Sequence, residues 1–286
     1  MSFLTRSVVA AVVLALLVPL VALAGDGGKK HGFVTGKQSR LLFATDNAGN
    51  LLRFNEHSPW LVRSQPITGL AAGVSLKGID FRPATGDLYA LGSDRVVYRV
   101  NPRTAIAVAE GPAFETTPTA LQGDRIGFDF NPTVDKIRIT SDADDNFRLD
   151  PDPGSLLMND TKLTPADVTV VGSAYTNSSF AAFANRPTAT MLFAYDTSGK
   201  KDRLWLQNPA NAGTLMNPLS TGLDLGTDVG FDIAGAANRG YVAGTHSGRS
   251  GARLYTVDVT TGKTHQLGRI GGGSVVVTGL AAWQDQ

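Results

Sequence analysis

The chain has 286 residues, 42% of them hydrophobic, with 26 Lys and Arg against 25 Asp and Glu. Balanced charge without a basic run gives no electrostatic reason to expect nucleic acid or an anionic membrane surface as partner. The sequence has no Cys, which excludes disulfides, thiolate nucleophiles and Cys-ligated zinc or iron–sulfur clusters.

The first 24 residues have the three parts of a secretory signal peptide. Arg6 supplies the positive charge, Val8–Leu23 is apolar, and Ala22-Leu23-Ala24 fits a cleavage site for small residues. The alternative is an uncleaved membrane anchor, but Pro19 lies near the end of the apolar run and no charged stop-transfer flank follows. We therefore predict cleavage after residue 24, and no membrane contact afterwards.

Residues 25–40 are rich in Gly and Lys and lack periodicity, so we predict a flexible leader. A surface-binding tail is the alternative, although Lys29-Lys30 is only a short basic cluster. Residues 41–286 are then predicted to form a single domain.

The stretch Gly78–Gly111 has the pattern of four short strands separated by turn residues. Such a small sheet is apolar on both faces and must stack on further copies of itself. The predicted strands are Gly78–Phe81, Asp87–Leu91, Arg95–Asn101 and Ala105–Ala109.

The first strand of this unit recurs along the chain. Clear copies are GIDF (78–81), GFDF (127–130) and GFDI (230–233), and weaker copies are GSAY (172–175) and GLAA (279–282). Four-stranded repeats of about 40–50 residues are typical of β-propellers. The fold class we predict is all-β, a five-bladed β-propeller.

The two ends of the chain complement each other. Leu41–Thr45, Leu51–Asn55 and Leu61–Pro66 match the second to fourth strands of a unit, while Gly279–Trp283 is an isolated first strand. We therefore expect the C-terminal strand to complete the N-terminal blade, which removes the open sheet edges.

Two features of the repeat are less regular. A six-bladed alternative would use residues 68–72, which repeat 278–282, but Gly69 and Gly78 are too close for a blade between them. The fourth unit is predicted to carry insertions at 176–190 and at 208–228.

Six runs carry the repeat and its turns: GIDFRPATGDLYAL (78–91), GFDFNPTVDKIRITSD (127–142), NFRLDPDPG (146–154), AYTN (174–177), NPANAGTL (208–215) and LYTVDVTTG (254–262). In these runs the chain resembles a known family, the one named domain of unknown function 4394. The resemblance implies an exported bacterial protein, secreted or periplasmic, with a propeller-like fold. It implies no reaction or ligand, so no catalytic residue can be transferred.

Asp80, Asp129 and Asp232 occupy the same position of three inner strands. Three carboxylates that converge near a narrow channel could bind a hard cation such as calcium through oxygen. The alternative, which we favour, is structural: each Asp accepts backbone N–H bonds from the neighbouring blade. Ala174 and Ala281 stand at this position in the other two blades.

Arg82, Asn131 and Arg138 follow these Asp residues closely in the repeat, and we include them with the Asp residues as candidate ligand-binding positions in the channel. Each Arg, like Arg148, could pair with an Asp or hold an anionic ligand, with paired surface or inter-blade charges as the default expectation.

Other patterns are weaker. Residues 141–146 begin like a calcium loop, but Phe147 and Pro153 stand where the turn Gly and the bidentate Glu should be, so we predict an acidic hairpin turn. The four His residues lack metal-ligand spacing. The Trp residues could pack in the core or stack on a sugar.

The sequence therefore predicts an exported, monomeric propeller that acts as a binding or scaffolding module for a small molecule, glycan or protein, with no cofactor. The alternative is a hydrolase or lactonase-like enzyme that uses the channel carboxylates with calcium.

Overall fold

The computed structural model describes residues 40–114, 121–181, 183–272 and 275–284. The predicted signal peptide (1–24) and the leader (25–40), apart from Arg40, lie outside the described residues. Within the described part, no helix has the length and apolar character needed to cross a membrane.

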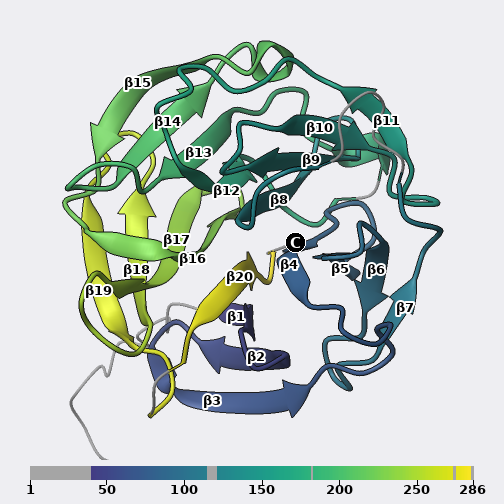
Figure 1. The fold of residues 1–286 in the computed structure, drawn as a ribbon, viewed down its shortest axis with the longest axis horizontal. Coiled ribbons are helices and arrows are strands. Elements are labelled where there is room, and N and C mark those ends of the chain that lie inside the picture. Colours follow the sequence, from purple (N-terminus) through teal and green to yellow (C-terminus); the bar gives the residue numbers. More distant parts are fainter. Residues whose placement is uncertain (1–39, 115–120, 182, 273–274, 285–286) are drawn as a thin grey trace, which may run out of the picture. The chain divides into compact units, whose positions relative to one another are not determined.

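The described residues form five four-stranded antiparallel sheets arranged around a common centre (Figure 1). Each sheet is one blade, and the blades are numbered here in chain order. Blade 1 contains β20 (Val277–Ala282), β1 (Leu41–Asp46), β2 (Asn50–Asn55) and β3 (Ser58–Pro66); blade 2 contains β4 (Leu76–Phe81), β5 (Leu88–Gly92), β6 (Val97–Val100) and β7 (Ala107–Ala109); blade 3 contains β8 (Ile126–Asn131), β9 (Lys136–Ser141), β10 (Asn146–Leu149) and β11 (Leu156–Asn159); blade 4 contains β12 (Val170–Tyr175), β13 (Leu192–Asp196), β14 (Arg203–Gln207) and β15 (Leu215–Ser220); blade 5 contains β16 (Leu225–Ala234), β17 (Arg239–His246), β18 (Arg253–Asp258) and β19 (Thr264–Arg269).

The predicted five-bladed propeller and its closure are confirmed. Strand β20 pairs antiparallel with β1, so residues from the end of the chain complete the first blade (Figure 1). The side chains of Leu280 and Ala282 are buried in one apolar cluster with Leu42 and Ala44. The six-bladed alternative is wrong, because residues 69–73 form a loop between β3 and β4.

The apolar core lies between the blades. One buried cluster joins blades 1 and 2, another joins blades 2 and 3, and similar clusters join blades 4 and 5 and blades 5 and 1. Because each sheet buries both of its faces against neighbouring sheets, no blade has a complete core of its own. This explains why most strand sequences are apolar on both faces. Blade 3 is the exception, because it turns the buried polar side chains of Arg138 and Thr140 toward blade 4.

Blade 4 differs in part from the prediction. The segment 208–228 is not an insertion, because it contains the outer strand β15 and the start of β16. Strand β15 was missed because Asn217-Pro218 interrupts its sequence, and Pro is tolerated in an edge strand.

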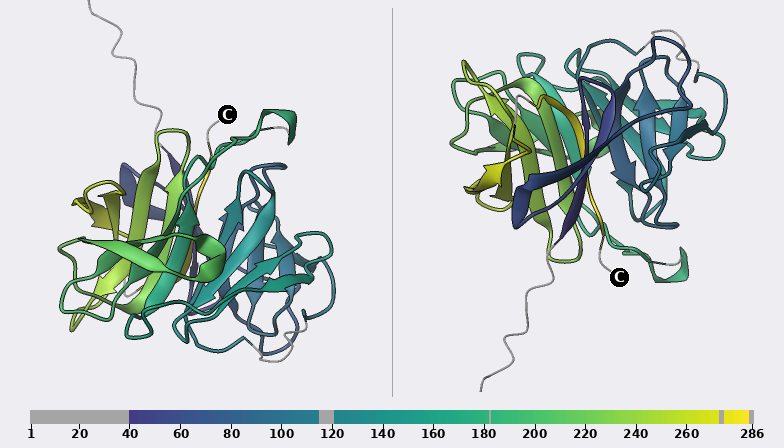
Figure 2. Two further views of the ribbon diagram at one scale, coloured as in Figure 1. Left: turned by 90° about the horizontal axis from the view of Figure 1, so that it is seen from above. Right: turned by 90° about the horizontal axis from the view of Figure 1, so that it is seen from below.

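The segment 176–191 does lie between two neighbouring strands, β12 and β13, and it projects from the face where β20 ends (Figure 2). Phe180 in this segment makes edge-on ring contacts with Phe81 and Trp283.

Candidate functional site

The signature glycines line a narrow passage along the centre of the propeller. The space between the inner strands β4, β8, β12, β16 and β20 measures only about 10 Å³ at this level, and its lining includes Gly78, Gly127, Gly172, Gly230 and Gly279. A Cβ atom added to Gly230 would lie 2.6 Å from Cβ of Leu280 in the next blade. Glycine is therefore needed here because adjacent inner strands approach too closely for a side chain.

The three signature Asp side chains converge two residues further along their strands. One carboxylate oxygen from each of Asp80, Asp129 and Asp232 lies within 4.8 Å of the others. All three residues are at most 2% exposed. The structure thus brings together the three acidic members of the predicted group, and we call them the Asp cluster.

Backbone N–H groups account for most of the oxygens of the Asp cluster. Asp80 accepts from Phe81 at 2.7 Å and from Phe130 in the next blade at 2.8 Å. Asp232 does the same with Ile233 and, in the next blade, Ala282, both at 2.6 Å. These bonds connect blade 2 to blade 3 and blade 5 to blade 1.

Asp129 completes the pattern with a single bond, from the backbone N–H of Tyr175 in blade 4 at 3.0 Å. Every inner strand therefore has the N–H that follows its signature position bonded to one of three carboxylates. This arrangement also explains how Ala174 and Ala281 are tolerated, because Asp232 and Asp80 serve the donors that those positions would have served. Among the described residues, Oδ2 of Asp129 accepts no backbone N–H.

Burial raises the pKa of each carboxyl in the Asp cluster. The pKa of Asp80 lies well above its ordinary value because of burial and the charge of Asp232. The pKa of Asp129 is raised in the same direction by burial and by its two acidic neighbours. Burial raises the pKa of Asp232 to about 6, although two N–H bonds oppose the shift. Since Oδ2 of Asp129 has no N–H donor, it can take a proton without losing a backbone bond.

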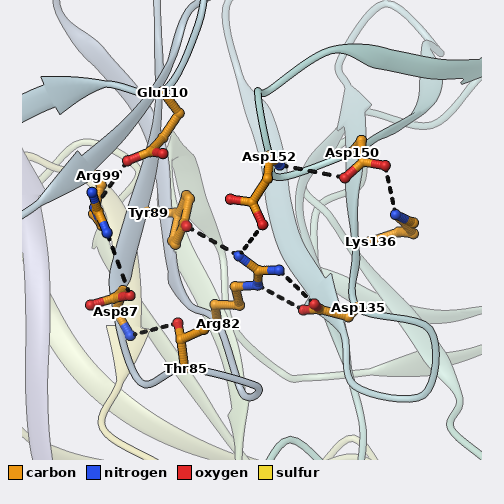
Figure 3. Close-up of polar contacts among 10 residues, drawn as sticks. All are labelled: Arg82, Thr85, Asp87, Tyr89, Arg99, Glu110, Asp135, Lys136, Asp150 and Asp152. Carbon is orange, nitrogen blue, oxygen red and sulfur yellow. Dashed lines mark hydrogen bonds and ion pairs between the residues drawn. The ribbon is translucent and has the colours of Figure 1, made fainter. Parts of the chain in front are cut away.

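Arg82 is not bonded to the Asp cluster. Its guanidinium holds Asp135 with Nε and Nη2, at 2.9 and 2.6 Å, and donates through Nη1 to Asp152 and to the hydroxyl of Tyr89 (Figure 3). Arg82 belongs to blade 2, whereas Asp135 and Asp152 belong to blade 3. The arginine therefore connects two blades, in line with the default expectation of inter-blade charge pairs.

Asn131 and Arg138 also act locally. Oδ1 of Asn131 accepts from the N–H and the hydroxyl of Thr133, which fixes the turn after β8. Arg138 is 1% exposed and donates to Asn146 and Asp160 in its own blade and to Asn211 in blade 4, each at 2.7 Å. Neither residue is brought to the Asp cluster.

The weaker patterns have structural roles too. Residues 142–145 form the turn between β9 and β10, as predicted, but Asp145 in this turn is buried and pairs with Lys162. His246 bonds the hydroxyl of Tyr255 at 2.8 Å. Trp205 is buried, whereas Trp60 and Trp283 are 53% and 39% exposed.

A larger cavity opens at the face where the inner strands begin, and we call it the mouth cavity. Its volume is about 580 Å³. The floor is apolar and comes from the starts of inner strands, namely Leu76, Ile126, Val171 and Val229. One wall is the β3–β4 loop, residues 67–75, and charged side chains line another part.

Four of the charged residues that line the mouth cavity form two ion pairs. Arg125 Nη2 lies 2.9 Å from Asp228 Oδ1, which links blade 3 to blade 5 across blade 4. Lys77 Nζ lies 4.0 Å from Asp124 Oδ1. The sequence did not identify this cavity, because its residues come from loops and strand ends without a shared motif. The one usable signal was a positive charge one or two residues before a signature glycine, at Lys77 and Arg125.

The family model described as Domain of unknown function (DUF4394) matches residues 50–281. The chain belongs to this family. No curated protein sequence matches this DUF4394 chain.

Several solved structures have a similar outline at low identity. The Dos1 propeller is 15% identical, with 78% of this chain and 56% of that chain covered and a TM-score of 0.39. A protein from Lactobacillus plantarum is 16% identical, with 84% and 71% covered and a TM-score of 0.43. The COPII outer coat vertex is 10% identical, with 79% and 57% covered and a TM-score of 0.43. This chain thus spans little more than half the length of the first and third of these, and none of them indicates a ligand.

Proposed function

We propose that this DUF4394 propeller is an exported binding module that holds a small organic molecule in the mouth cavity. The observation that carries the proposal is the cavity itself, about 580 Å³ in volume, over the start of the central passage. Small-molecule sites are concave, largely apolar and about 300–1,000 Å³ in size, with a few polar groups that orient the ligand. Export rests on the sequence pattern of residues 1–24.

The passage below the cavity favours binding over catalysis. The Asp cluster lies beyond the level of the signature glycines, where the free space is about 10 Å³. Its carboxyls are buried and already accept five backbone N–H bonds. A general acid or base must come within about 3 Å of the reacting group, and a ligand in the mouth cavity does not reach these carboxyls. The hydrolase alternative therefore has less support.

The proposal is tested by blocking the cavity. A library of small organic molecules is screened by ligand-observed NMR against the chain from residue 25, and against Ala48→Trp, which places an indole in the exposed turn that lines the cavity. We expect hits that Ala48→Trp loses. The matched control is Ala237→Trp in the exposed β16–β17 turn, which should keep the hits. Hits that survive Ala48→Trp, or no hits at all, would contradict the proposal.

The calcium-dependent alternative has its own test. An ion bound to the Asp cluster would stabilise the folded state by mass action, so removing it would lower the melting temperature. We expect EDTA and added calcium to leave the melting temperature unchanged. A chelator-sensitive transition that Asp129→Asn abolishes would support the alternative.

A further inference from the structure

We infer that the mouth cavity selects an organic carboxylate with an apolar body. This inference rests on the proposed function and specifies its ligand class. The carboxylate would bind Arg125 and Lys77, and the apolar body would lie over the floor and against the β3–β4 loop. The inference follows from counting donors and acceptors around the cavity and from the position of its apolar surface.

Arg125 has an unused donor. Arg82 and Arg148 each hold one carboxylate with Nε and Nη2 together, the two-pronged geometry that suits guanidinium. Among the described residues, Arg125 reaches Asp228 through Nη2 alone, and its buried Nε has no hydrogen-bond partner. A buried donor without an acceptor is costly. The Arg125 side chain is 32% exposed, so a ligand carboxylate can reach its guanidinium, and a small shift of that group would let Nε bond the ligand together with Nη2.

Lys77 also has spare capacity. Its ammonium carries three donors, and within the part of the chain that the structure describes its one ion-pair partner is Asp124, whose Oδ1 lies 4.0 Å away, beyond hydrogen-bond range. The Asp124 side chain is 82% exposed, so water solvates its carboxylate and the ion pair with Lys77 is weak. Lys77 and Arg125 lie at the starts of neighbouring inner strands, β4 and β8, and both line the cavity.

The acidic residues of the cavity are better satisfied. Asp46 accepts from the N–H groups of Ala48 and Asn50 and from the Asn50 side chain. Asp228 already forms an ion pair with Arg125. The lining carries three carboxylates, those of Asp46, Asp124 and Asp228, and two cations, so the spare donors of Arg125 and Lys77, and not the net charge, are what fit a ligand carboxylate.

The apolar body follows from the rest of the lining. Ile67, Leu70 and Val74 of the β3–β4 loop and the aliphatic floor offer no charge. Because the passage below narrows to about 10 Å³, the ligand must fill the mouth cavity and cannot extend into the passage. An aliphatic or aromatic acid of modest size satisfies both parts of the lining.

The test compares octanoate with 1-octanol, which differ in the anionic head. Binding of each is measured by NMR titration against the chain from residue 25. We expect octanoate to bind at least about tenfold more tightly than octanol, and Arg125→Gln to remove most of that preference. Octanol affinity should be unchanged in Arg125→Gln, which shows that the variant is folded and the cavity intact. The control Arg103→Gln removes an exposed cation outside the cavity and should change neither affinity.

A second variant should change the octanoate affinity in the opposite direction. Asp228→Asn keeps the side-chain shape but removes the charge that competes for Arg125, so octanoate should bind more tightly. Equal affinity for octanol and octanoate, or a preference that Arg125→Gln leaves intact, would overturn the carboxylate inference while the binding proposal stands. If neither probe binds and the library yields no cavity-dependent hit, both proposals fail.

Discussion

Asp129 and Asp232 occupy equivalent positions in the repeat but accept different numbers of backbone bonds. Both oxygens of Asp232 accept a backbone N–H. Asp232→Asn must therefore turn its amide NH₂ toward one of these N–H groups, which is left without an acceptor. Asp129 uses one oxygen, so Asn can replace it and keep the bond to Tyr175. We expect Asp232→Asn to lower the free energy of unfolding by about 1–3 kcal/mol and Asp129→Asn to have little or no cost at pH 7.

Urea denaturation of both variants measures the difference, and Asp258→Asn at the exposed end of β18 is the control for removing a carboxylate elsewhere. If Asp232→Asn and Asp129→Asn lower the free energy of unfolding equally, the number of backbone N–H bonds that each Asp accepts does not determine its contribution to stability.

The raised pKa values predict a dependence of stability on pH. Burial raises the folded pKa of Asp232 to about 6, against an ordinary value of 3.8, and shifts Asp80 and Asp129 in the same direction. A carboxyl whose pKa is higher in the folded state than in the unfolded state stabilises the fold. This stabilisation is fully present below the unfolded-state pKa and is lost as pH rises through the folded-state pKa. We therefore expect a higher melting temperature at pH 5 than at pH 7.

Asp129→Asn removes one of the titrating groups, so its melting temperature should change less between pH 5 and pH 7. Asp202, whose pKa burial raises to about 6, preserves part of the trend in this variant. Glu56 and Asp196 have lowered pKa values, so their contribution is lost only at lower pH. An identical pH slope in wild type and Asp129→Asn would contradict a raised pKa at this position.

The signature glycines give a prediction about close packing. Gly230→Ala places a methyl group 2.6 Å from Cβ of Leu280 and 2.8 Å from its backbone nitrogen, so the two inner strands must separate. Such overpacking costs about 1–3 kcal/mol. The matched control is Gly226→Ala on the same strand, where the nearest atom is 3.7 Å away. Thermal unfolding should show a clear loss for the first variant and almost none for the second, and equal losses would contradict the packing explanation.

At the scale of elements, the positions of most strands could be predicted from local sequence, whereas the side-chain contacts between blades could not. The signature strands were predictable because Gly recurs in all five repeats and Asp follows it two residues later in three of them, as at Gly127 and Asp129. Strand β15 was not, because Pro218 disguises an edge strand. The partners of Arg82 were also out of reach, since Asp135 and Asp152 lie far along the chain and only blade stacking brings them near.

The segment between β12 and β13 is held by Phe180, which packs on Phe81 and Trp283 with ring centroids 6.3 and 4.9 Å away. Phe180→Ala should release this segment and cost about 1–2 kcal/mol, because aromatic pairs and partial burial are both lost. Limited proteolysis should then cut within residues 176–191 faster than in the wild type, while circular dichroism stays unchanged. Unaltered cleavage would show that other contacts hold the segment, such as the bond between Ala181 N–H and Pro83 O.

At the scale of the whole molecule, the site is harder to predict than the fold. Five similar repeats specify five blades and one closing strand, because each repeat needs a neighbour on both faces. The mouth cavity belongs to no repeat. Lys77, Arg125 and Asp228 come from three blades, and their proximity depends on the ring as assembled. The repeat therefore shows the Asp cluster directly, while the cavity emerges only from the closed structure.

Ring closure depends on the last strand. Strand β20 pairs with β1 from Leu42↔Ala282 to Asp46↔Val277, and the N–H of Ala282 bonds Asp232 in blade 5. Deleting Gly279–Gln286 removes most of this pairing. It also leaves the Asp232 carboxylate without the N–H of Ala282 and exposes the apolar cluster around Leu42. The loss should amount to several kcal/mol and leave an open edge on β1 that promotes aggregation.

Thermal unfolding and light scattering measure this loss, with deletion of residues 285–286 alone as the control. A synthetic peptide of residues 275–286 should restore part of the melting temperature, because it can pair with β1 and again donate the N–H of Ala282 to Asp232 in blade 5. A truncated protein that melts like the wild type and stays monomeric would show that the first blade is stable without β20. Destabilisation that the peptide fails to reverse would point to a folding role for the strand and not to closure of the finished ring.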